Sequence, residues 1–485
     1  MRKLIVAAAT AATLGTLGLT ATAQAQPVVH HVDATINRTV VAGIPAFFDI
    51  KRTSSTACTW TATGLPGPVT AAPGLTNKCT ERVDGVWPTA GTNTATITVK
   101  SSSTGTLTFT VTTTVKASPG ENDAVGVGSD TITPVTNQLA QGYNGTIVST
   151  APHEYSWDAV NPITGAIGDS IPIKADCSPI PRPDGSSAGI NQLKTFTKSS
   201  SGPFCTNFAR SSRARASTDP PFAAGGVAFV TLAGDAITWS IPTQNTFAPK
   251  SLTDSQLTEI WSCTVPQANS GTGPNQWGDL NPALTGTAAT QAIQPFLPQS
   301  GSGTLATWLT DIGVTTPGSC VSNNGNMLEE NEGVNPALNV SGGIFIYSVG
   351  DYIAQTVHSN KCLNSGCTPN SSGVVCAHTP NKNAFFCNVH GVENLGQIDG
   401  VSPISGTGSS EVINSSFPSK YFRTLFNVVP FDPATTNHIP GATSPVGGVN
   451  LEPIFSSTGY DCTSAGKAIV KAYGFVSLPT CGTTS

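Results

Sequence analysis

Three short segments place glycines and small hydroxyl residues where a helix is expected to begin. They are residues 126–131 (GVGSDT), 184–189 (DGSSAG) and 301–304 (GSGT). The glycines would let the backbone come close to a bound group, and a helix start offers free N–H groups and about half a positive charge. Three such starts aimed at one point would bind a small anion without any lysine. A single Ser or Thr there is most often only a helix cap, so the hypothesis depends on all three together.

The residues around these segments predict the elements that must position them. Short apolar strands alternate with helical patterns, which favours an α/β domain. Val125 and Val127 precede the first segment, and Pro134 falls in the first helical turn, where proline is tolerated. The expected apolar helix faces are Val135 and Leu139; Ile190, Leu193 and Phe196; and Leu305, Trp308, Leu309 and Ile312. The α/β domain begins near residue 119, and its length of about 365 residues predicts two lobes.

In chain order, these segments resemble the substrate-binding proteins of phosphate ABC transporters, the periplasmic or extracellular phosphate-binding proteins, as a divergent branch of that family. The resemblance covers most of residues 119–485. It depends on residues 128–131, 185–189, 207–213 and 301–304, with further support from 331–333 and 473–475. It implies a two-lobed type II periplasmic-binding-protein fold that closes on its ligand. Lobe one would be residues 119–234 and 421–485, and lobe two residues 235–420.

The resemblance also implies which residues hold the ligand. Thr131 and the backbone of Ile132 would donate from the first segment and Ser186 from the second. The family's ligand-accepting Asp falls at Ser212, and its ligand-pairing Arg falls near Pro298, where no basic residue stands. Arg210 and Arg213 are the nearest candidates to restore that charge, unless they belong to a solvated loop. The expected ligand-binding set is Thr131, Ile132, Ser186, Ser212, Arg213, Ser302, Gly303 and Thr304.

These residues predict an exported, non-enzymatic solute-binding protein for phosphate or a similar small oxyanion, acting in uptake or sensing. Its expected partner is the membrane component of an ABC transporter. We expect a monomer, and no cofactor or metal. Two alternatives stay open: a secreted phosphatase-like enzyme that uses the same anion cradle, and a surface adhesion protein with a degenerate ligand site.

An enzyme would need a nucleophile with a base, or a metal cluster. The sequence contains no His-Glu-x-x-His motif. Ser302 has no evident base partner, and the hydroxyl is interpreted as a helix cap. Four carboxylates form no evident paired site: Glu329, Glu330, Glu332 and Asp351.

The first 118 residues predict a separate N-terminal part. Residues 1–26 combine Arg2 and Lys3, an apolar run and small-x-small cleavage sites, which is typical of a secretory signal peptide. Residues 27–118 show apolar residues alternating with threonine, such as Ala95, Ile97 and Val99, which indicates half-buried strands. The run Trp87 to Thr92 resembles bacterial immunoglobulin-like domains and implies an all-β sandwich in an exported, periplasmic or extracellular protein.

Charge and cysteine content fit an exported protein. The chain has 23 basic and 28 acidic residues; without Arg2 and Lys3 there are 21 basic residues and the net charge is −7, which argues against nucleic acid as a partner. Twelve cysteines in an exported chain are interpreted as disulfides, formed within even local groups. The groups are Cys58 and Cys79; Cys177 and Cys205; Cys263 and Cys320; Cys362, Cys367, Cys376 and Cys387; and Cys462 and Cys481. The segment from His358 to His390, which also holds His378, could instead bind zinc.

Overall fold

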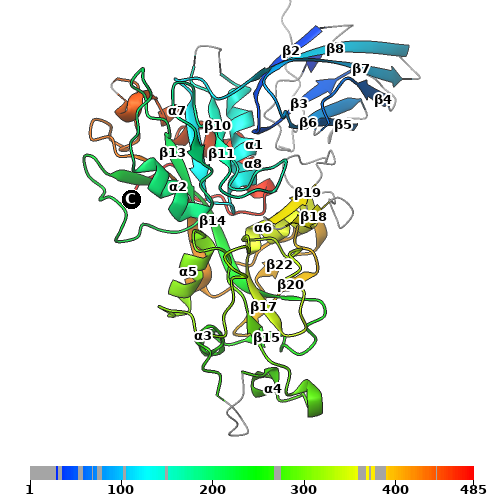
Figure 1. The fold of residues 1–485 in the computed structure, drawn as a ribbon, viewed down its shortest axis with the longest axis vertical. Coiled ribbons are helices and arrows are strands. Elements are labelled where there is room, and N and C mark those ends of the chain that lie inside the picture. Colours follow the sequence, from blue (N-terminus) through cyan, green and yellow to red (C-terminus); the bar gives the residue numbers. More distant parts are fainter. Residues whose placement is uncertain are drawn as a thin grey trace, which may run out of the picture.

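The structure is a computed structural model. It describes residues 29–30, 35–52, 58–67, 69–73, 79–101, 105–147, 151–266, 275–358, 367–370, 373–376, 389–443 and 445–485. The expected signal peptide at residues 1–26 lies outside these ranges. Figure 1 shows an all-β unit beside the upper of two α/β halves, with the second half below it.

The N-terminal unit is built from two four-stranded sheets. One has the order β1-β3-β6-β5 and the other β2-β8-β7-β4. Their bounds are β1 Val29–His30, β2 Thr35–Val41, β3 Pro45–Lys51, β4 Cys58–Thr63, β5 Val69–Pro73, β6 Thr80–Val86, β7 Gly91–Ser101 and β8 Gly105–Lys116. Phe48, Trp87 and Phe109 lie in the core that both sheets share. In β7, buried Ala95, Ile97 and Val99 alternate with more exposed residues, so the predicted alternation is confirmed; the immunoglobulin-like assignment stays a prediction.

One mixed sheet runs through both α/β halves. Its order is β10-β9-β13-β24-β14-β17-β16, and β20 also pairs with β14. These strands are β9 Ala124–Gly128, β10 Glu154–Ser156, β13 Phe208–Ser211, β14 Val227–Pro242, β16 Gln294–Pro295, β17 Gly343–Ser348, β20 Glu393–Leu395 and β24 Phe422–Pro430. The first part of β14 pairs with β24 and its last part with β17 and β20. The two expected crossings between lobes, at 234/235 and 420/421, fall within β14 and just before β24.

Helices cover the sheet around two hydrophobic cores. They are α1 Thr133–Asn144, α2 Gly185–Leu193, α3 Asp254–Ser262, α4 Trp277–Leu280, α5 Gly303–Asp311, α6 Val349–Ile353, α7 Glu452–Phe455 and α8 Ser464–Ala472. Leu139 of α1 and Ile469 of α8 share the upper core with β14 and β24. Trp261 and Trp308 meet in the lower core with ring centroids 5.1 Å apart. Both cores combine apolar residues of the helices with apolar residues of the shared sheet.

The remaining strands are short two-stranded ribbons. They are β11 Ser170–Ile171 with β12 Ile180–Pro181, β15 Ser251–Leu252 with β21 Gln397–Ile398, β18 Cys367–Asn370 with β19 Gly373–Cys376, and β22 Ile404–Ser405 with β23 Val412–Ile413.

Helix α2 is shorter than expected. It ends at Leu193, so Phe196, which was expected on its apolar face, lies outside the helix and has a φ of +47°.

Apolar contacts join the N-terminal unit to the upper half. Val41 and Ile44, at the end of β2 and before β3, belong to one buried cluster with Val125, Tyr155 and Trp157. A methyl group at Gly43 would lie 3.3 Å from the Trp157 ring, which shows how closely the backbone approaches that side chain. The sandwich is therefore packed against the α/β domain rather than connected only by the chain.

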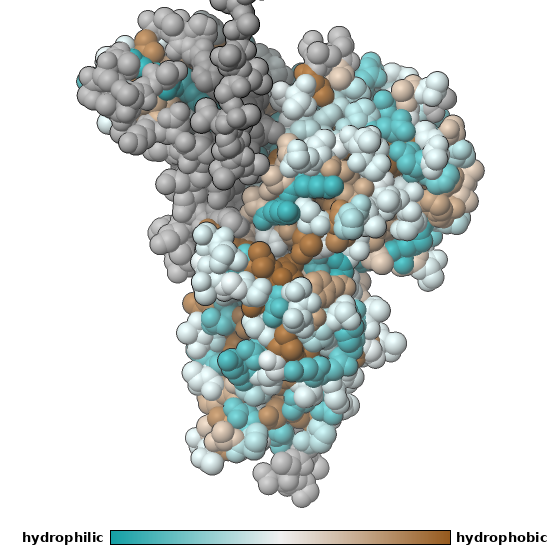
Figure 2. Space-filling view, turned by 180° about the vertical axis from the view of Figure 1, so that it is seen from behind, coloured by the Kyte–Doolittle hydropathy of each residue, from teal (hydrophilic) through white to brown (hydrophobic). Residues whose placement is uncertain are grey.

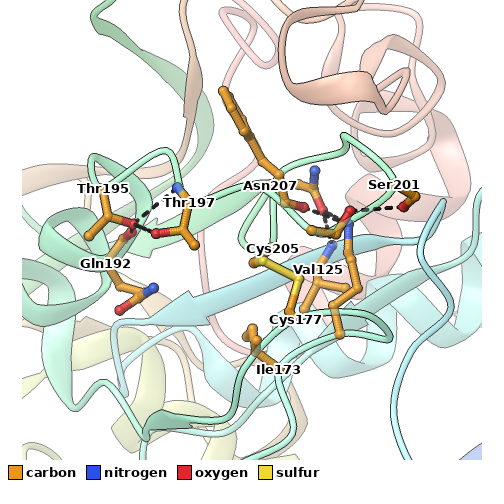
Figure 3. The surroundings of a disulfide bond; sticks show 12 residues. Val125, Ile173, Cys177, Gln192, Thr195, Thr197, Ser201, Cys205 and Asn207 are labelled. Atoms are coloured by element: carbon orange, nitrogen blue, oxygen red, sulfur yellow. Dashed lines mark hydrogen bonds between the residues drawn. A yellow bond between two sulfur atoms is a disulfide. The ribbon is translucent and has the colours of Figure 1, made fainter.

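Four of the expected disulfides are present: Cys58–Cys79, Cys177–Cys205, Cys263–Cys320 and Cys462–Cys481. Figure 3 shows Cys177–Cys205 beside Asn207, whose side-chain oxygen accepts from Val125 N at 3.1 Å. The same oxygen accepts from the buried Lys174 ammonium at 2.5 Å. The side chains of Cys362, Cys367, Cys376 and Cys387 lie outside the described residues, although Cys367 and Cys376 are directly opposite each other in the β18–β19 ribbon.

Candidate functional site

The segments that open α1, α2 and α5 meet where the two halves join. Figure 1 shows α2 in the upper half and α5 in the lower half, near this junction. Ser302 is the N-cap of α5, and its Oγ accepts from Leu305 N at 3.0 Å. Gly185 opens α2 with a φ of +84°, and a Cβ there would lie 2.4 Å from the Gly301 carbonyl oxygen. Only glycine therefore allows the second segment to lie directly against the third.

Hydroxyl groups from the upper half touch the start of α5 in the lower half. Thr131 Oγ1 and Thr304 Oγ1 are 3.1 Å apart, and Thr307 Oγ1 donates to the Ser212 carbonyl at 3.3 Å. A Cβ at Gly303 would lie 2.3 Å from Ser186 Oγ and 2.5 Å from Ser212 Oγ. The cradle is therefore closed, and its walls are in direct contact.

The carboxylate of Glu330 occupies the point at which these donors converge. Its Oε1 accepts from Thr131 N at 3.3 Å. Its Oε2 accepts from Ser302 Oγ at 2.6 Å and from Thr304 N at 3.2 Å. Glu330 is fully buried, with 0% of its surface exposed. One carboxylate thus takes donors from the first and third predicted segments, and hence from both halves of the domain.

One guanidinium, that of Arg423 on β24, also reaches the cradle. It donates to Thr304 Oγ1 at 2.8 Å and to the Ser212 carbonyl at 3.1 Å. It also forms a buried ion pair with Asp235 at 2.7 Å. Arg423 therefore brings a positive charge to the site, and Asp235 already neutralises that charge.

Further carboxyl groups surround the cradle, and burial raises their pKa values. Burial and the charge of Glu330 raise the pKa of Asp184 to about 7, while a hydrogen bond with Glu329 lowers it. Burial raises the pKa of Glu332 to about 8, with a further contribution from Asp184. The pKa of Asp130 is well above its usual range for the same reason, with Glu332 the next cause. The neutral form of these groups is favoured, because ionised neighbours would repel one another in a dry site.

Comparison with known protein families accords with this arrangement. The family model described as the PBP superfamily domain matches residues 89–368, which is more than half of the chain. The chain belongs to the PBP superfamily. The expected relation to binding proteins and the two-lobed α/β fold are thereby confirmed, and the family supports binding of a small solute in general.

Other comparisons add nothing to the superfamily assignment. None of the curated proteins matches the chain. An endo-fucoidan hydrolase of glycoside hydrolase family 107 has 19% identity and a TM-score of 0.14, covering 21% of this chain and 14% of its own. A 2,6-sialyltransferase of Photobacterium has 15% identity and a TM-score of 0.15, covering 27% of this chain and 30% of its own. At such scores, neither similarity bears on the fold or the activity of this PBP superfamily member.

The structure of the PBP superfamily domain brings most of the expected ligand-binding residues together. Thr131, Ser186, Ser212, Ser302, Gly303 and Thr304 all lie at the closed cradle, and Ile132 is the N-cap of α1. Arg213 instead pairs with Asp219 at 2.7 Å and donates to Ser187 Oγ. Arg210 is buried and donates to the Ser129 and Gly128 carbonyls. These two arginines are engaged within the upper half rather than lying in a solvated loop.

The polar groups at this PBP site have partners that the sequence did not indicate. The predicted cap role of Ser302 is confirmed, and its hydroxyl also donates a hydrogen bond to Glu330 at 2.6 Å. Glu330 accepts from three donors, and Asp351 accepts from Asn331 Nδ2 at 2.7 Å. The only sequence signal near Glu330 was the adjacent landmark at residues 331–333. Arg423 gave no local signal at all, because it lies 119 residues after Thr304.

Within the described residues, no group of three or more His, Cys, Asp or Glu side chains is arranged to hold a metal ion. The zinc alternative concerns residues 358–390, most of which lie outside the described ranges. No helix among the described residues has the length and apolar character needed to cross a membrane.

Proposed function

We propose that this PBP superfamily member is an exported solute-binding protein for phosphate or a similar small oxyanion, held at the starts of α1, α2 and α5. The observation that carries the proposal is the set of donors on Glu330: Thr131 N from one half, and Ser302 Oγ and Thr304 N from the other. A site that satisfies one anionic carboxylate with these donors has the chemistry to satisfy another oxyanion. Delivery to an ABC transporter belongs to the same proposal.

The test is a thermal-shift screen of the mature protein with phosphate, sulfate, arsenate and phosphonates. A ligand at a hundred times its dissociation constant should stabilise the folded state by about 2.7 kcal/mol. Ser302→Ala should reduce the shift, because it removes the one side-chain donor and keeps the two backbone N–H donors. Unchanged melting with all four ligands at millimolar concentration would count against oxyanion binding.

A second candidate, a surface protein without a ligand, is favoured by one observation. Gly303 lies directly against Ser186 and Ser212, so the closed site is filled by the chain itself. This candidate predicts that no oxyanion binds even when the Glu330 carboxylate is removed.

We also expect no phosphatase activity. Ser302 is 1% exposed, and its oxygen already accepts from Leu305 N while its proton is donated to Glu330. A nucleophile must reach its substrate, which a buried cap hydroxyl in a closed site does not. Hydrolysis of a chromogenic phosphate ester that is lost in Ser302→Ala would contradict the binding-protein proposal.

A further inference from the structure

The site to which the proposed function assigns an oxyanion is already occupied by a side chain of the protein, Glu330. The Glu330 carboxylate takes donors on both of its oxygens, within a site whose walls touch at Gly303. A buried carboxylate is stable only when its oxygens are satisfied by donors or paired charges. Here the satisfying donors are those that a bound oxyanion would need.

We infer that Glu330 is a built-in occupant of the oxyanion cradle, and that a ligand binds only by displacing its carboxylate. This inference depends on the proposed function, because it concerns the same donors. The competition follows from geometry. Ser302 has one hydroxyl proton, and Thr131 and Thr304 each have one backbone N–H, so the three donors cannot serve Glu330 and a second anion together.

Charge around the cradle strengthens the competition. Glu329, Glu332, Asp130 and Asp184 lie near enough to perturb one another's ionisation. An oxyanion placed beside the Glu330 carboxylate would bring two acceptor-only groups into one buried site. The guanidinium of Arg423 reaches the cradle, but its positive charge is paired with Asp235. The binding free energy of a ligand is therefore most favourable when the Glu330 carboxylate moves out of the cradle as the ligand binds.

The same carboxylate also holds the two halves together without a ligand. Thr131 belongs to the upper half, whereas Ser302 and Thr304 belong to the lower half with Glu330. Other contacts across the boundary are Gln299 Nε2 to Asp184 Oδ1 at 3.1 Å and Ser187 N to the Gly301 carbonyl at 3.1 Å. The occupied cradle thus stabilises the closed form, which lowers the apparent affinity for a ligand by the fraction of molecules whose site is vacant.

The test compares phosphate binding by calorimetry in the wild type, Glu330→Ala and Glu330→Gln. Glu330→Ala vacates the cradle, and Glu330→Gln keeps one acceptor oxygen but replaces the other with an N–H₂ group that cannot accept from a donor. Glu332→Gln is the matched control, because it removes a neighbouring carboxyl group without vacating the cradle. Both Glu330 variants should bind phosphate about tenfold or more tightly than the wild type, and the control should stay within about threefold.

Chemical rescue provides a second readout in case Glu330→Ala is poorly stable. Formate and acetate should raise the melting temperature of Glu330→Ala by refilling the cradle, and should leave the wild type unchanged. Ser302→Ala added to Glu330→Ala should remove this rescue, since it deletes one of the three donors.

The outcomes separate this inference from the proposed function. Wild-type protein that binds phosphate as tightly as Glu330→Ala would overturn the role of Glu330 and leave the proposed function standing. Rescue by formate, with no phosphate binding to any variant, would support the occupant and overturn phosphate as ligand. Absence of both rescue and oxyanion binding in folded Glu330→Ala would overturn both.

Discussion

At the residue scale, Ser302 has two roles in one hydroxyl group. Its oxygen caps α5 by accepting from Leu305 N, and its proton satisfies Glu330. Thr253 caps α3 in the same way but is part of an exposed capping box with Gln256. The pair of residues therefore allows the cost of a cap to be separated from the cost of leaving a buried carboxylate short of a donor.

We expect Ser302→Ala to destabilise the protein more than Thr253→Ala. Loss of a cap costs about 1 kcal/mol, and loss of a hydrogen bond to a charged buried group adds about 1.5–3 kcal/mol. Chemical denaturation of both variants measures the two free energies of unfolding. Equal values would show that the Ser302–Glu330 contact contributes nothing beyond the cap.

Arg423 and Asp235 form a buried ion pair beside the cradle, and each has other partners. Arg423→Met should cost about 3–5 kcal/mol, because it leaves the Asp235 carboxylate buried without its guanidinium. Adding Asp235→Asn should recover part of that cost, since the unpaired charge is then gone. Unfolding measurements on the two single variants and the double variant give the coupling energy. Additive losses would contradict this account of the pair.

The raised pKa of Asp184 predicts a pH dependence that one variant can isolate. Because the folded pKa is about 7 and the usual value is 3.8, the stability that Asp184 contributes is present below about pH 4 and is lost as the pH rises through 7. The melting temperature of Asp184→Asn should therefore rise relative to that of the wild type as the pH increases from 5 to 8. The difference between the two proteins cancels opposing contributions from groups such as Lys174. A constant difference across this range would refute the assignment.

The three hydroxyl segments could be predicted from the sequence because each has a local signature, a glycine-rich run followed by an apolar helix face. Their meeting point could be expected only from the resemblance to phosphate-binding proteins. Glu330 and Arg423 could not be predicted, because their roles depend on contacts across 199 and 119 residues of chain. A carboxylate in an acidic run and an arginine in a strand have no spacing pattern that indicates such partners.

At the element scale, alternation predicted strands well where one face is buried, as in β7 and β8. The long strand β14 is different, since nearly all of its residues are buried and its apolar run alone does not show that it serves both halves. That role follows from pairing with β24 at one end and β17 at the other. The short helix α6 was also not predicted; its N-cap Ser348 accepts from Asp351 N at 3.1 Å.

Disulfides fix several of these elements to one another. Cys462–Cys481 connects the segment before α8 to the C-terminal residues that bond to β14 through Thr231 and Phe229. We expect all twelve cysteines to be oxidised, because the proposed function places the protein in an oxidising compartment. Thiol titration under denaturing, non-reducing conditions should find close to none. Four free thiols together with bound zinc would instead indicate a metal site in the segment from His358 to His390.

At the scale of the whole molecule, three units are held together by buried contacts. The sandwich packs on the upper half through Val41, Ile44 and Trp157, and β14 and β24 connect the halves. Figure 2 shows polar and apolar residues mixed over both halves, with an apolar area at the waist between them. Under the proposed function, a ligand would act by changing how the two halves contact each other at this waist.

Solution scattering tests whether the unliganded protein is closed. In the wild type, Glu330 satisfies donors from both halves, so we expect the radius of gyration to be the same with and without phosphate. Glu330→Ala leaves Thr131 N, Ser302 Oγ and Thr304 N buried without an acceptor, which costs free energy unless the halves separate and water reaches them. This variant should have a larger radius of gyration, which phosphate should bring back to the wild-type value. Glu332→Gln should stay closed throughout, because it leaves the three donors satisfied. A wild type that contracts when phosphate is added would show that the empty protein is open and that Glu330 does not hold its halves together.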